Sequence, residues 1–407
     1  MRGAVKRNVR IAVISPFVDR QHGTERAVAE LIDRLLNQHH DQIDLYAQRV
    51  GDLSAEPPLQ AANNDRGAIY WHRVKAFPGP HLLQFIGWLL LNRLARKRNE
   101  RVSKTRSDIV FSPGINAFDA DVILVHVVFH RVAELQNSPV GLGLRSLHRR
   151  LYYSLLCSLE KKIYGNPQVT LAAVSPHTAQ QLARYFGRQD VVVIPNGVDS
   201  DYFSPAAIQS MRASGRRDFN CSANDFVLLL IGNDWRSKGL PALLAAAAQC
   251  RDLSIRLLVV GQDDRAPFIA LAAELKILDR LQFVSPLSDV RTFYAAADLL
   301  VAPSLEDSFN LPVLEAMSCG VPVIVSPRAG ISHWLKHGHD CLLLKSPEDA
   351  AELVAAIRLL ATDPGKRGEI SANALQTAKK FSWDAHATEL RKLLVSAAET
   401  KALRKKS

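Results

Sequence analysis

The chain has 407 residues, of which 47% are hydrophobic and 22% charged, and its formal net charge at pH 7 is +11. These proportions are typical of a soluble globular protein, and the length favours two or three domains with large cores. No apolar run approaches the ~20 residues that a membrane-spanning helix needs, so no spanning helix is predicted.

The start of the chain and its cysteines bear on the compartment. The first residues are basic and then apolar, like a signal peptide, but the apolar run is short and reaches Pro16 without a small-residue cleavage site. Residues 9–15 are therefore predicted to be a first β-strand. The five cysteines are far apart, odd in number and without the spacing of a metal site, which argues against a disulfide framework or structural zinc and favours a reducing cytosol.

Short β-branched runs alternate with longer amphipathic segments along the whole chain. Helices are predicted between the strands, such as 25–38 and 239–250. Several strands are apolar on both faces, as in parallel sheets covered by helices, and this alternation predicts a doubly wound α/β fold. The predicted strands are 9–15, 42–48, 108–113, 121–129, 169–175, 190–197, 226–232, 255–261, 281–285, 298–304 and 321–326.

The pattern indicates two Rossmann-like domains in tandem. It restarts at Phe226 after a polar stretch, which places a domain joint around residues 203–222. The predicted domains are residues 1–203 and 204–380. Ligands of open α/β sheets bind beyond the carboxyl ends of the strands, so two such domains facing each other would form a cleft.

The positive charge is concentrated in the first half of the chain. Residues 1–200 hold 26 Lys and Arg against 17 Asp and Glu, which accounts for +9 of the net charge. A basic half is suited to nucleic acid, an anionic lipid or an anionic substrate, and an ordinary solvated surface is the alternative.

The segment 77–106 differs from the rest of that half. A leucine-rich stretch that includes Trp88 is followed by seven basic residues, namely Arg93, Arg96, Lys97, Arg98, Arg101, Lys104 and Arg106. The apolar part is too short to cross a bilayer but long enough to lie on one. We therefore consider peripheral contact with an anionic membrane as a hypothesis, and a helix with one buried face and a solvated basic end as the alternative.

The stretch LEDSFNLPVLEAMSCGVPVI, residues 305–324, predicts an anion-binding turn. A strand ends at Ser304, Pro312 suits the first helical position, and Gly320 ends the helix. The loop therefore gathers unpaired N–H groups at the positive end of a helix dipole, where phosphate binds readily. The predicted donors are the backbone amides of Ser308, Phe309, Asn310 and Leu311.

Carboxylates next to an anion site need another role. Asp307 precedes the amides, and Glu315 is predicted in the first helical turn. A carboxylate accepts hydrogen bonds from sugar hydroxyls, so phosphate and carboxylates together predict a nucleotide sugar as ligand. The alternatives are that Glu315 complements the helix dipole, worth about 0.3–1 kcal/mol, and that Asp307 caps a turn.

The segment SLEDSFNLPVLEAMSCGVPVI closely resembles the signature of the family 4 retaining glycosyltransferases, which have the GT-B fold of two Rossmann-like domains facing across a cleft. The family motif is a Glu, seven residues and a second Glu. The second acid corresponds to Glu315, and the first falls on Asp307, with Glu306 as a neighbour that is an alternative to it. The resemblance implies that the first acid contacts the donor sugar and the second the ribose hydroxyls.

The resemblance extends over nearly the whole chain. Residues 174–203 resemble the family's segment at the domain joint, residues 283–304 fit the scaffold under the base pocket, and residues 381–407 resemble its final helix, which crosses back to the first domain. In the loop after the strand 226–232, Lys238 and Arg236 match the basic pair that clamps the donor diphosphate. Fixed cations and helix-terminal amides stabilise a departing diphosphate without a metal, so no metal cofactor is expected.

The first half contributes further candidates. The family often has a Gly-Gly pair where this chain has His22-Gly23, and Gly23 would let backbone approach the donor phosphate or the acceptor. His126 matches a histidine that the family often has near the sugar, and a satisfied core histidine is the alternative. His130 is a lesser candidate. Asp119-Ala120-Asp121 has the form of a metal-binding DxD motif, but it precedes its strand, whereas a ligand site follows one.

The sequence thus predicts transfer of a sugar, with retention, from a nucleoside diphosphate sugar to a glycan or lipid-linked acceptor, in the synthesis of lipopolysaccharide or another cell-envelope polysaccharide. The expected location is the cytoplasm, including the inner face of the plasma membrane. A sugar-nucleotide epimerase of the same fold is the first alternative. A basic nucleic-acid-binding protein is the second, although no aromatic-basic interleaving or recognition motif supports it. No G-x-G-x-x-G or Walker loop is present for a dinucleotide or P-loop enzyme.

Overall fold

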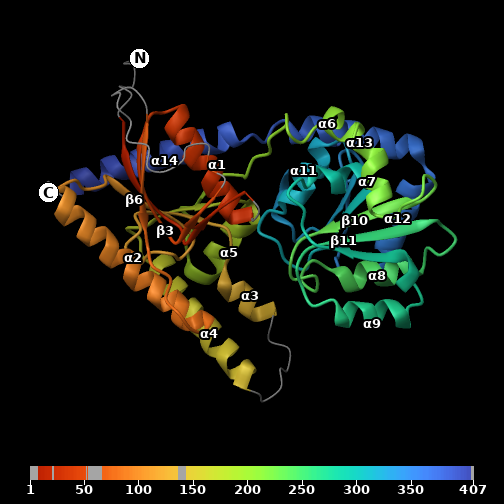
Figure 1. Cartoon of the computed structure of the whole chain (residues 1–407), viewed down its shortest axis with the longest axis horizontal. Helices are drawn as coiled ribbons and strands as arrows, with labels where there is room; N and C mark the ends of the chain where they lie inside the picture. Colours follow the sequence, from red (N-terminus) through yellow and green to blue (C-terminus); the bar gives the residue numbers. More distant parts are fainter. Residues whose placement is uncertain (1–7, 21–22, 52, 54–66, 136–143, 405–407) are drawn as a thin grey trace. The chain divides into compact units, whose positions relative to one another are not determined.

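The protein is described by a computed structural model that covers residues 8–20, 23–51, 53, 67–135 and 144–404 (Figure 1). Its residues fall into two compact units. Unit 1 consists of residues 1–195 and 383–407, and unit 2 of residues 196–382. The chain thus passes between the units after Pro195 rather than after residue 203, and its last helix belongs to unit 1.

Unit 1 contains a seven-stranded sheet in the order β5-β3-β1-β6-β7-β8-β9, and all its pairings are parallel. The strands are β1 (Arg10–Ile14), β3 (Gln42–Ala47), β5 (Ala68–Arg73), β6 (Ile109–Pro113), β7 (Val122–Val125), β8 (Thr170–Ala173) and β9 (Val192–Val193). A separate parallel pair joins β2 (Phe17–Val18) and β4 (Arg49–Val50). The helices are α1 (Gly23–Asn37), α2 (His81–Ser103), α3 (Phe129–Leu135), α4 (Leu144–Tyr164), α5 (Pro176–Phe186) and α14 (Trp383–Arg404).

Ion pairs hold α14 on unit 1. Arg391 makes two hydrogen bonds to the fully buried carboxylate of Asp41, at 2.6 and 2.9 Å. Lys401 Nζ lies 2.5 Å from Asp121 Oδ2. Because Asp41 precedes β3 and Asp121 precedes β7, both contacts attach α14 near the amino ends of sheet strands.

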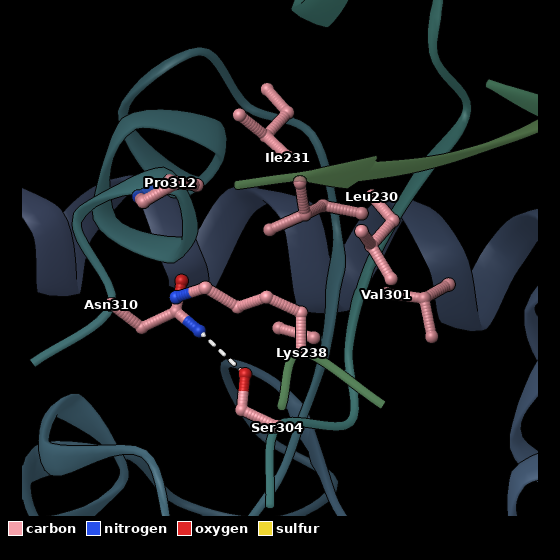
Figure 2. A pocket seen from close by; sticks show the side chains of 9 residues that line it. Leu230, Ile231, Lys238, Val301, Ser304, Asn310 and Pro312 are labelled. Carbon is pink, nitrogen blue, oxygen red and sulfur yellow. Dashed lines mark hydrogen bonds between the residues drawn. The ribbon is translucent and has the colours of Figure 1, made fainter. Parts of the chain in front are cut away.

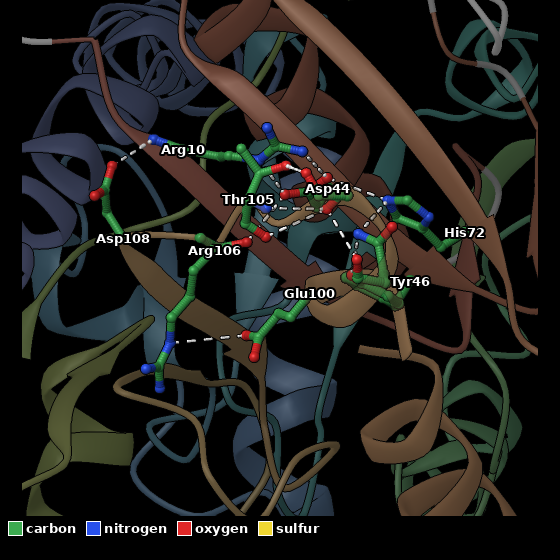
Figure 3. Close-up of polar contacts among 11 residues, drawn as sticks. Arg10, Asp44, Tyr46, His72, Glu100, Thr105, Arg106 and Asp108 are labelled. Carbon is green, nitrogen blue, oxygen red and sulfur yellow. Dashed lines mark hydrogen bonds and ion pairs between the residues drawn. The ribbon is translucent and has the colours of Figure 1, made fainter. Parts of the chain in front are cut away.

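A polar network lies among β1, β3, β5 and the end of α2 (Figure 3). The Asp44 carboxylate accepts hydrogen bonds from Arg10 at 2.6 and 2.8 Å and from Ser107 Oγ at 3.0 Å, and it lies 3.1 Å from His72 Nε2. Asp44 is 2% exposed, so this charge is buried but fully surrounded by donors.

Unit 2 contains a six-stranded parallel sheet in the order β12-β11-β10-β13-β14-β15. The strands are β10 (Phe226–Ile231), β11 (Ile255–Val260), β12 (Leu281–Val284), β13 (Leu299–Ala302), β14 (Val323–Val325) and β15 (Leu342–Leu343). The helices are α6 (Pro205–Gln209), α7 (Arg212–Asp218), α8 (Leu240–Ala248), α9 (Ala266–Glu274), α10 (Arg291–Ala296), α11 (Leu311–Ser318), α12 (Ala350–Thr362) and α13 (Pro364–Ala378), with 3₁₀ turns at Leu278–Arg280 and Gly330–Trp334. Two parallel-sheet α/β units confirm the predicted fold class.

Four strands were not predicted, namely the short pair β2 and β4 and, in the two large sheets, β5 and β15. The strand β5 is at the edge of its sheet and leaves Tyr70 37% exposed, so its sequence lacks the continuous apolar run of a buried strand. The strand β15 has only two residues, too few for any periodicity to be read.

Candidate active site

The order of strands in unit 2 reverses between β10 and β13. The chain runs from β10 through β11 to β12 on one side, and β13 then pairs with β10 on the other side. Ligands of open parallel sheets bind outside the carboxyl ends of the strands at such a reversal. The loops that leave these two strands are residues 232–239 and 303–310, and they contact each other, because the Leu305 amide donates to the Ser237 carbonyl at 2.8 Å. The structure therefore joins the two loops that the sequence singled out.

Buried contacts fix the first of these loops. Trp235 is fully buried against the ring of Phe283, and its amide donates to Asp263 Oδ2 at 2.8 Å. Gly239 has a φ of +79°, and a Cβ atom there would lie 2.0 Å from the carbonyl oxygen of Pro303. Only glycine permits this close approach, which holds the preceding Lys238 against the second loop.

Lys238 and Asp307 form an ion pair between the two loops. Lys238 Nζ lies 2.5 Å from Asp307 Oδ2. A β-bridge to Ala329 fixes the backbone of Asp307, which restricts where its side chain can lie. Figure 2 shows the Lys238 side chain extending toward Asn310, and both residues line one pocket with Ser304. The predicted cation therefore lies at the start of the helix that carries Glu315.

The start of α11 is formed by an unusual backbone. Asn310 has a φ of +76°, and its Nδ2 donates to Ser304 Oγ at 3.3 Å instead of capping the helix. The helix begins at Leu311, so Pro312 is its second residue and not its first as predicted. Among the described residues, no side chain caps this terminus, which leaves helix amides for an anionic ligand.

The predicted set of phosphate-binding amides is wrong at Phe309. Its amide is expected above to bind phosphate, but in the structure it donates to Asp307 Oδ1 at 3.2 Å. Its ring is 2% exposed and packs against Trp334 and Phe381. Asp307 thus also caps the turn, as the alternative interpretation expects, while its other oxygen faces Lys238.

Glu315 is the fifth residue of α11 and so lies in its second turn, which corrects the prediction of the first turn. It is 5% exposed, and Tyr294 Oη donates to its Oε2 at 2.5 Å. A helix dipole acts mainly on charges in the first turn, so the dipole alternative explains little of this placement. Tyr294 is the contributor that the sequence did not single out, because it appeared only within the apolar run of the scaffold.

The remaining candidates of unit 2 lie in the same two loops. Glu306 and Ser308 are half-buried on either side of Asp307. Arg236 is exposed, and its side chain makes no hydrogen bond or ion pair within the part of the chain that the structure describes. Its position therefore leaves it able to turn toward a ligand at Lys238.

The candidates of the first half belong to unit 1. Gly23 is the exposed first residue of α1, and His22 lies outside the described residues. His126 follows β7 and is 6% exposed. Burial, with a smaller effect of the neighbouring His386, lowers the pKa of His126 to about 3. The ring nitrogens of His126 make no hydrogen bond of normal geometry among the described residues, and the Leu124 backbone is the polar group that acts on the ring, so its hydrogen-bonding capacity is at most partly satisfied.

His130 has a structural role. Its Nδ1 lies 2.8 Å from Glu160 Oε2, and the fully buried Glu160 carboxylate also accepts the amides of Phe129 and His130 at the start of α3. Burial raises the pKa of Glu160. Cys157 offers a third ligand atom within 4.8 Å of these groups. Because three donors already surround the carboxylate, we interpret the cluster as the anchor of α3.

The two acids of the DxD-like motif are also structural. Asp119 Oδ1 lies 2.5 Å from Arg96, and Asp121 Oδ2 accepts the Val110 amide at 2.8 Å and pairs with Lys401. Both residues precede β7, away from the carboxyl ends of the sheet.

The chain is similar in sequence to known glycosyltransferases. Residues 21–202 match the model described as Glycosyltransferase Family 4, and residues 211–377 match the model described as Glycosyl transferases group 1. The chain is 29% identical over 272 residues to D-inositol 3-phosphate glycosyltransferase from Pseudarthrobacter chlorophenolicus, a match that covers 64% of this chain and 62% of that protein. The chain thus spans less than two thirds of that relative's length.

Two solved structures show the fold. WaaG, a glycosyltransferase involved in lipopolysaccharide biosynthesis, is similar with a TM-score of 0.75 and 19% identity, over 94% of this chain and 99% of that chain. Anabaena HepE in complex with UDP-glucose is similar with a TM-score of 0.69 and 19% identity, over 96% and 100% of the two chains. The two parallel-sheet α/β units and the similarity to these structures identify the class as the GT-B fold. Within that class the two family models together cover most of the chain, and the chain belongs to family 4 of the glycosyltransferases.

Proposed function

We propose that the protein transfers a sugar from a nucleoside diphosphate sugar to an acceptor hydroxyl, with retention of the anomeric configuration. The observation that carries this proposal is the Lys238–Asp307 pair at the uncapped start of α11. A cation and helix amides suit a diphosphate, and the adjoining carboxylates suit hydroxyl groups. The names of the relatives agree with it, since one is a D-inositol 3-phosphate glycosyltransferase and HepE was solved with UDP-glucose.

The proposed chemistry is stabilisation of a departing nucleoside diphosphate. The transition state gains positive charge at the sugar and negative charge on the diphosphate. Lys238, Arg236 and the amides that begin α11 stabilise the diphosphate. Asp307 or Glu306 positions the donor sugar, and Glu315 binds the ribose hydroxyls. Because these groups supply the positive charge, the proposal includes no metal cofactor.

Two residues of unit 1 are proposed to bind substrate groups. The buried ring of His126 has hydrogen-bonding capacity left over among the described residues, and a sugar hydroxyl would use it. Gly23 opens α1 with exposed backbone that a donor phosphate or an acceptor can approach closely.

The proposed acceptor is an anionic or lipid-linked glycan of the cell envelope, such as a lipopolysaccharide. The support is the positive charge of the first 200 residues, the phosphate in the name of the D-inositol 3-phosphate relative and the printed role of WaaG. The proposed compartment is the cytoplasm.

A panel of nucleotide sugars tests this function. The true donor binds only the folded protein and should raise its melting temperature. At a hundredfold excess over the Kd, the folded state gains about 2.7 kcal/mol of stability. Incubation with envelope glycans must then yield free nucleoside diphosphate and an extended glycan. An isomerised donor without glycan would identify an epimerase instead, and a gel shift with nucleic acid that persists at moderate salt would favour the nucleic-acid alternative.

A further inference from the structure

Helix α2 exposes a continuous apolar stripe. Four large side chains follow one another at spacings of three, four and four residues, which places them on one face of a helix. Their exposed fractions are far above those of core residues, namely 47% for Leu83, 36% for Ile86, 55% for Leu90 and 62% for Leu94.

The opposite face of α2 is firmly attached to unit 1. Trp88 is 3% exposed, and its Nε1 donates to the Asn116 carbonyl at 3.1 Å. Asn92 Nδ2 donates to the same carbonyl at 3.2 Å, and Arg96 pairs with Asp119 at 2.5 Å. These contacts fix the rotation of α2 about its own axis. The apolar stripe is therefore the outer face of the helix.

The same outer face becomes basic toward the end of the helix. Lys97, Arg98 and Arg101 continue the spacing of the stripe. All three are exposed, and none makes an ion pair within the described residues. By contrast, Arg93 pairs with Asp119 and Arg106 lies 3.9 Å from Glu100. The structure thus separates the predicted basic run into paired residues and an unpaired outer group.

We infer that this α2 outer face, defined by Leu83, Ile86, Leu90, Leu94, Lys97, Arg98 and Arg101, binds the surface of an anionic lipid bilayer. Among the described residues no helix is long and apolar enough to cross a membrane, so α2 lies along the surface. The leucines enter the boundary between headgroups and acyl chains, and the three cations face lipid phosphates. Charge complementarity at the basic end selects anionic lipid as the partner.

Vesicle flotation tests the inference in the absence of any donor or acceptor. The full chain is expected to float with vesicles of phosphatidylcholine and phosphatidylglycerol and to remain behind with phosphatidylcholine alone. The double variant Lys97→Gln, Arg98→Gln should bind anionic vesicles about 30-fold more weakly, since each basic residue contributes about fivefold. The double variant Leu90→Asn, Leu94→Asn should bind at least tenfold more weakly.

Matched controls separate this face from general charge and hydrophobicity. Lys379→Gln, Lys380→Gln removes the same charge from exposed positions of unit 2, and Ile269→Asn, Leu359→Asn removes apolar groups that are each 40% exposed. Both controls should bind like the unaltered protein, and all variants should keep its melting temperature. Failure of the unaltered protein to bind anionic vesicles, equal loss in the controls, or a stripe that only mediates self-association in size-exclusion chromatography would overturn the inference. Because the assay contains no nucleotide sugar, these results leave the proposed glycosyl transfer untouched.

Discussion

The Lys238 ammonium and the Asp307 carboxylate face each other across two loops, with Nζ 2.5 Å from Oδ2. Their side chains are only 23% and 10% exposed, so the loss of one leaves the other charge poorly compensated. A diphosphate at this site would replace one anionic partner of Lys238 by another. Asp307 would then be released to accept a hydrogen bond from a sugar hydroxyl. The pair thus holds cation and acid in place before the donor binds.

Asp307→Asn should separate diphosphate binding from sugar transfer. Lys238 loses its internal anion, so the affinity for a nucleoside diphosphate should rise by roughly tenfold, the size of one partly screened charge interaction. Turnover of the sugar donor should nevertheless fall. Calorimetric titration and an initial-rate assay measure the two effects. Glu306→Gln, which removes the same charge one residue away, should raise the affinity less, and weaker diphosphate binding by Asp307→Asn would contradict the exchange of partners.

Tyr294→Phe should affect donor binding through Glu315. The substitution removes the hydroxyl that donates to the buried Glu315 carboxylate at 2.5 Å, which should cost about 1–3 kcal/mol of stability. With Glu315 less firmly held, the KM for the donor should rise about fivefold while kcat changes less. Denaturant unfolding and steady-state kinetics check both effects. Glu315→Gln should raise the KM by at least as much, and an unchanged KM in both variants would remove Glu315 from the site.

Two buried histidines should make unit 1 sensitive to mild acid. Burial lowers the pKa of His126 to about 3 and that of His386 to about 4, from an ordinary 6.5. Above pH 6.5 both histidines are neutral in the folded and in the unfolded protein, so they add no pH dependence to the free energy of unfolding. As the pH falls below 6.5 only the unfolded chain binds the protons, so each histidine costs about 1.4 kcal/mol per pH unit until its folded pKa is reached.

Unfolding curves between pH 7 and about pH 5 measure this loss. His126→Gln should remove its share, about 2 kcal/mol over that range. The exposed His81, changed to Gln, is the control and should leave the pH dependence intact. An unchanged slope in the His126 variant would contradict its burial in the neutral form.

Asp44 should contribute stability that disappears only in strong acid. Burial by itself raises the pKa of Asp44, but hydrogen bonds from His72 and Arg10 outweigh it and lower the pKa to about 2, below the ordinary 3.8. The contribution, about 2 kcal/mol, is complete above pH 3.8 and is lost as the pH falls through 2. Asp44→Asn should therefore destabilise unit 1 at neutral pH, and the difference should shrink below about pH 4. Asp252→Asn, which removes an exposed acid paired with Arg358, is the control and should change stability little.

Local sequence was sufficient for the architecture and for the two loops of the site. Apolar strands between amphipathic helices predicted both sheets, because burial on two faces requires continuous apolar runs. The turn before α11 was predicted from Pro312 and Gly320, and the error of one position reflects the ordinary uncertainty of helix ends. The edge strand β5 was missed because its exposed side chains lack that pattern.

Contacts between residues that are distant in the sequence could not be predicted from it. The Lys238–Asp307 pair, the Tyr294–Glu315 hydrogen bond and the proximity of His126 to His386 depend on how strands and helices are arranged in space. The same limit applies to the basic run of α2, where spacing alone did not show which cations are paired with carboxylates.

The most direct measurement is the turnover of a matching nucleoside diphosphate sugar by the unaltered protein and by Lys238→Ala. Free nucleoside diphosphate and extended glycan are expected to appear together, and the variant should be slower by on the order of 10²–10³ at a temperature where both proteins remain folded. Turnover in the variant close to that of the unaltered protein would contradict the role of Lys238 in stabilising the departing diphosphate.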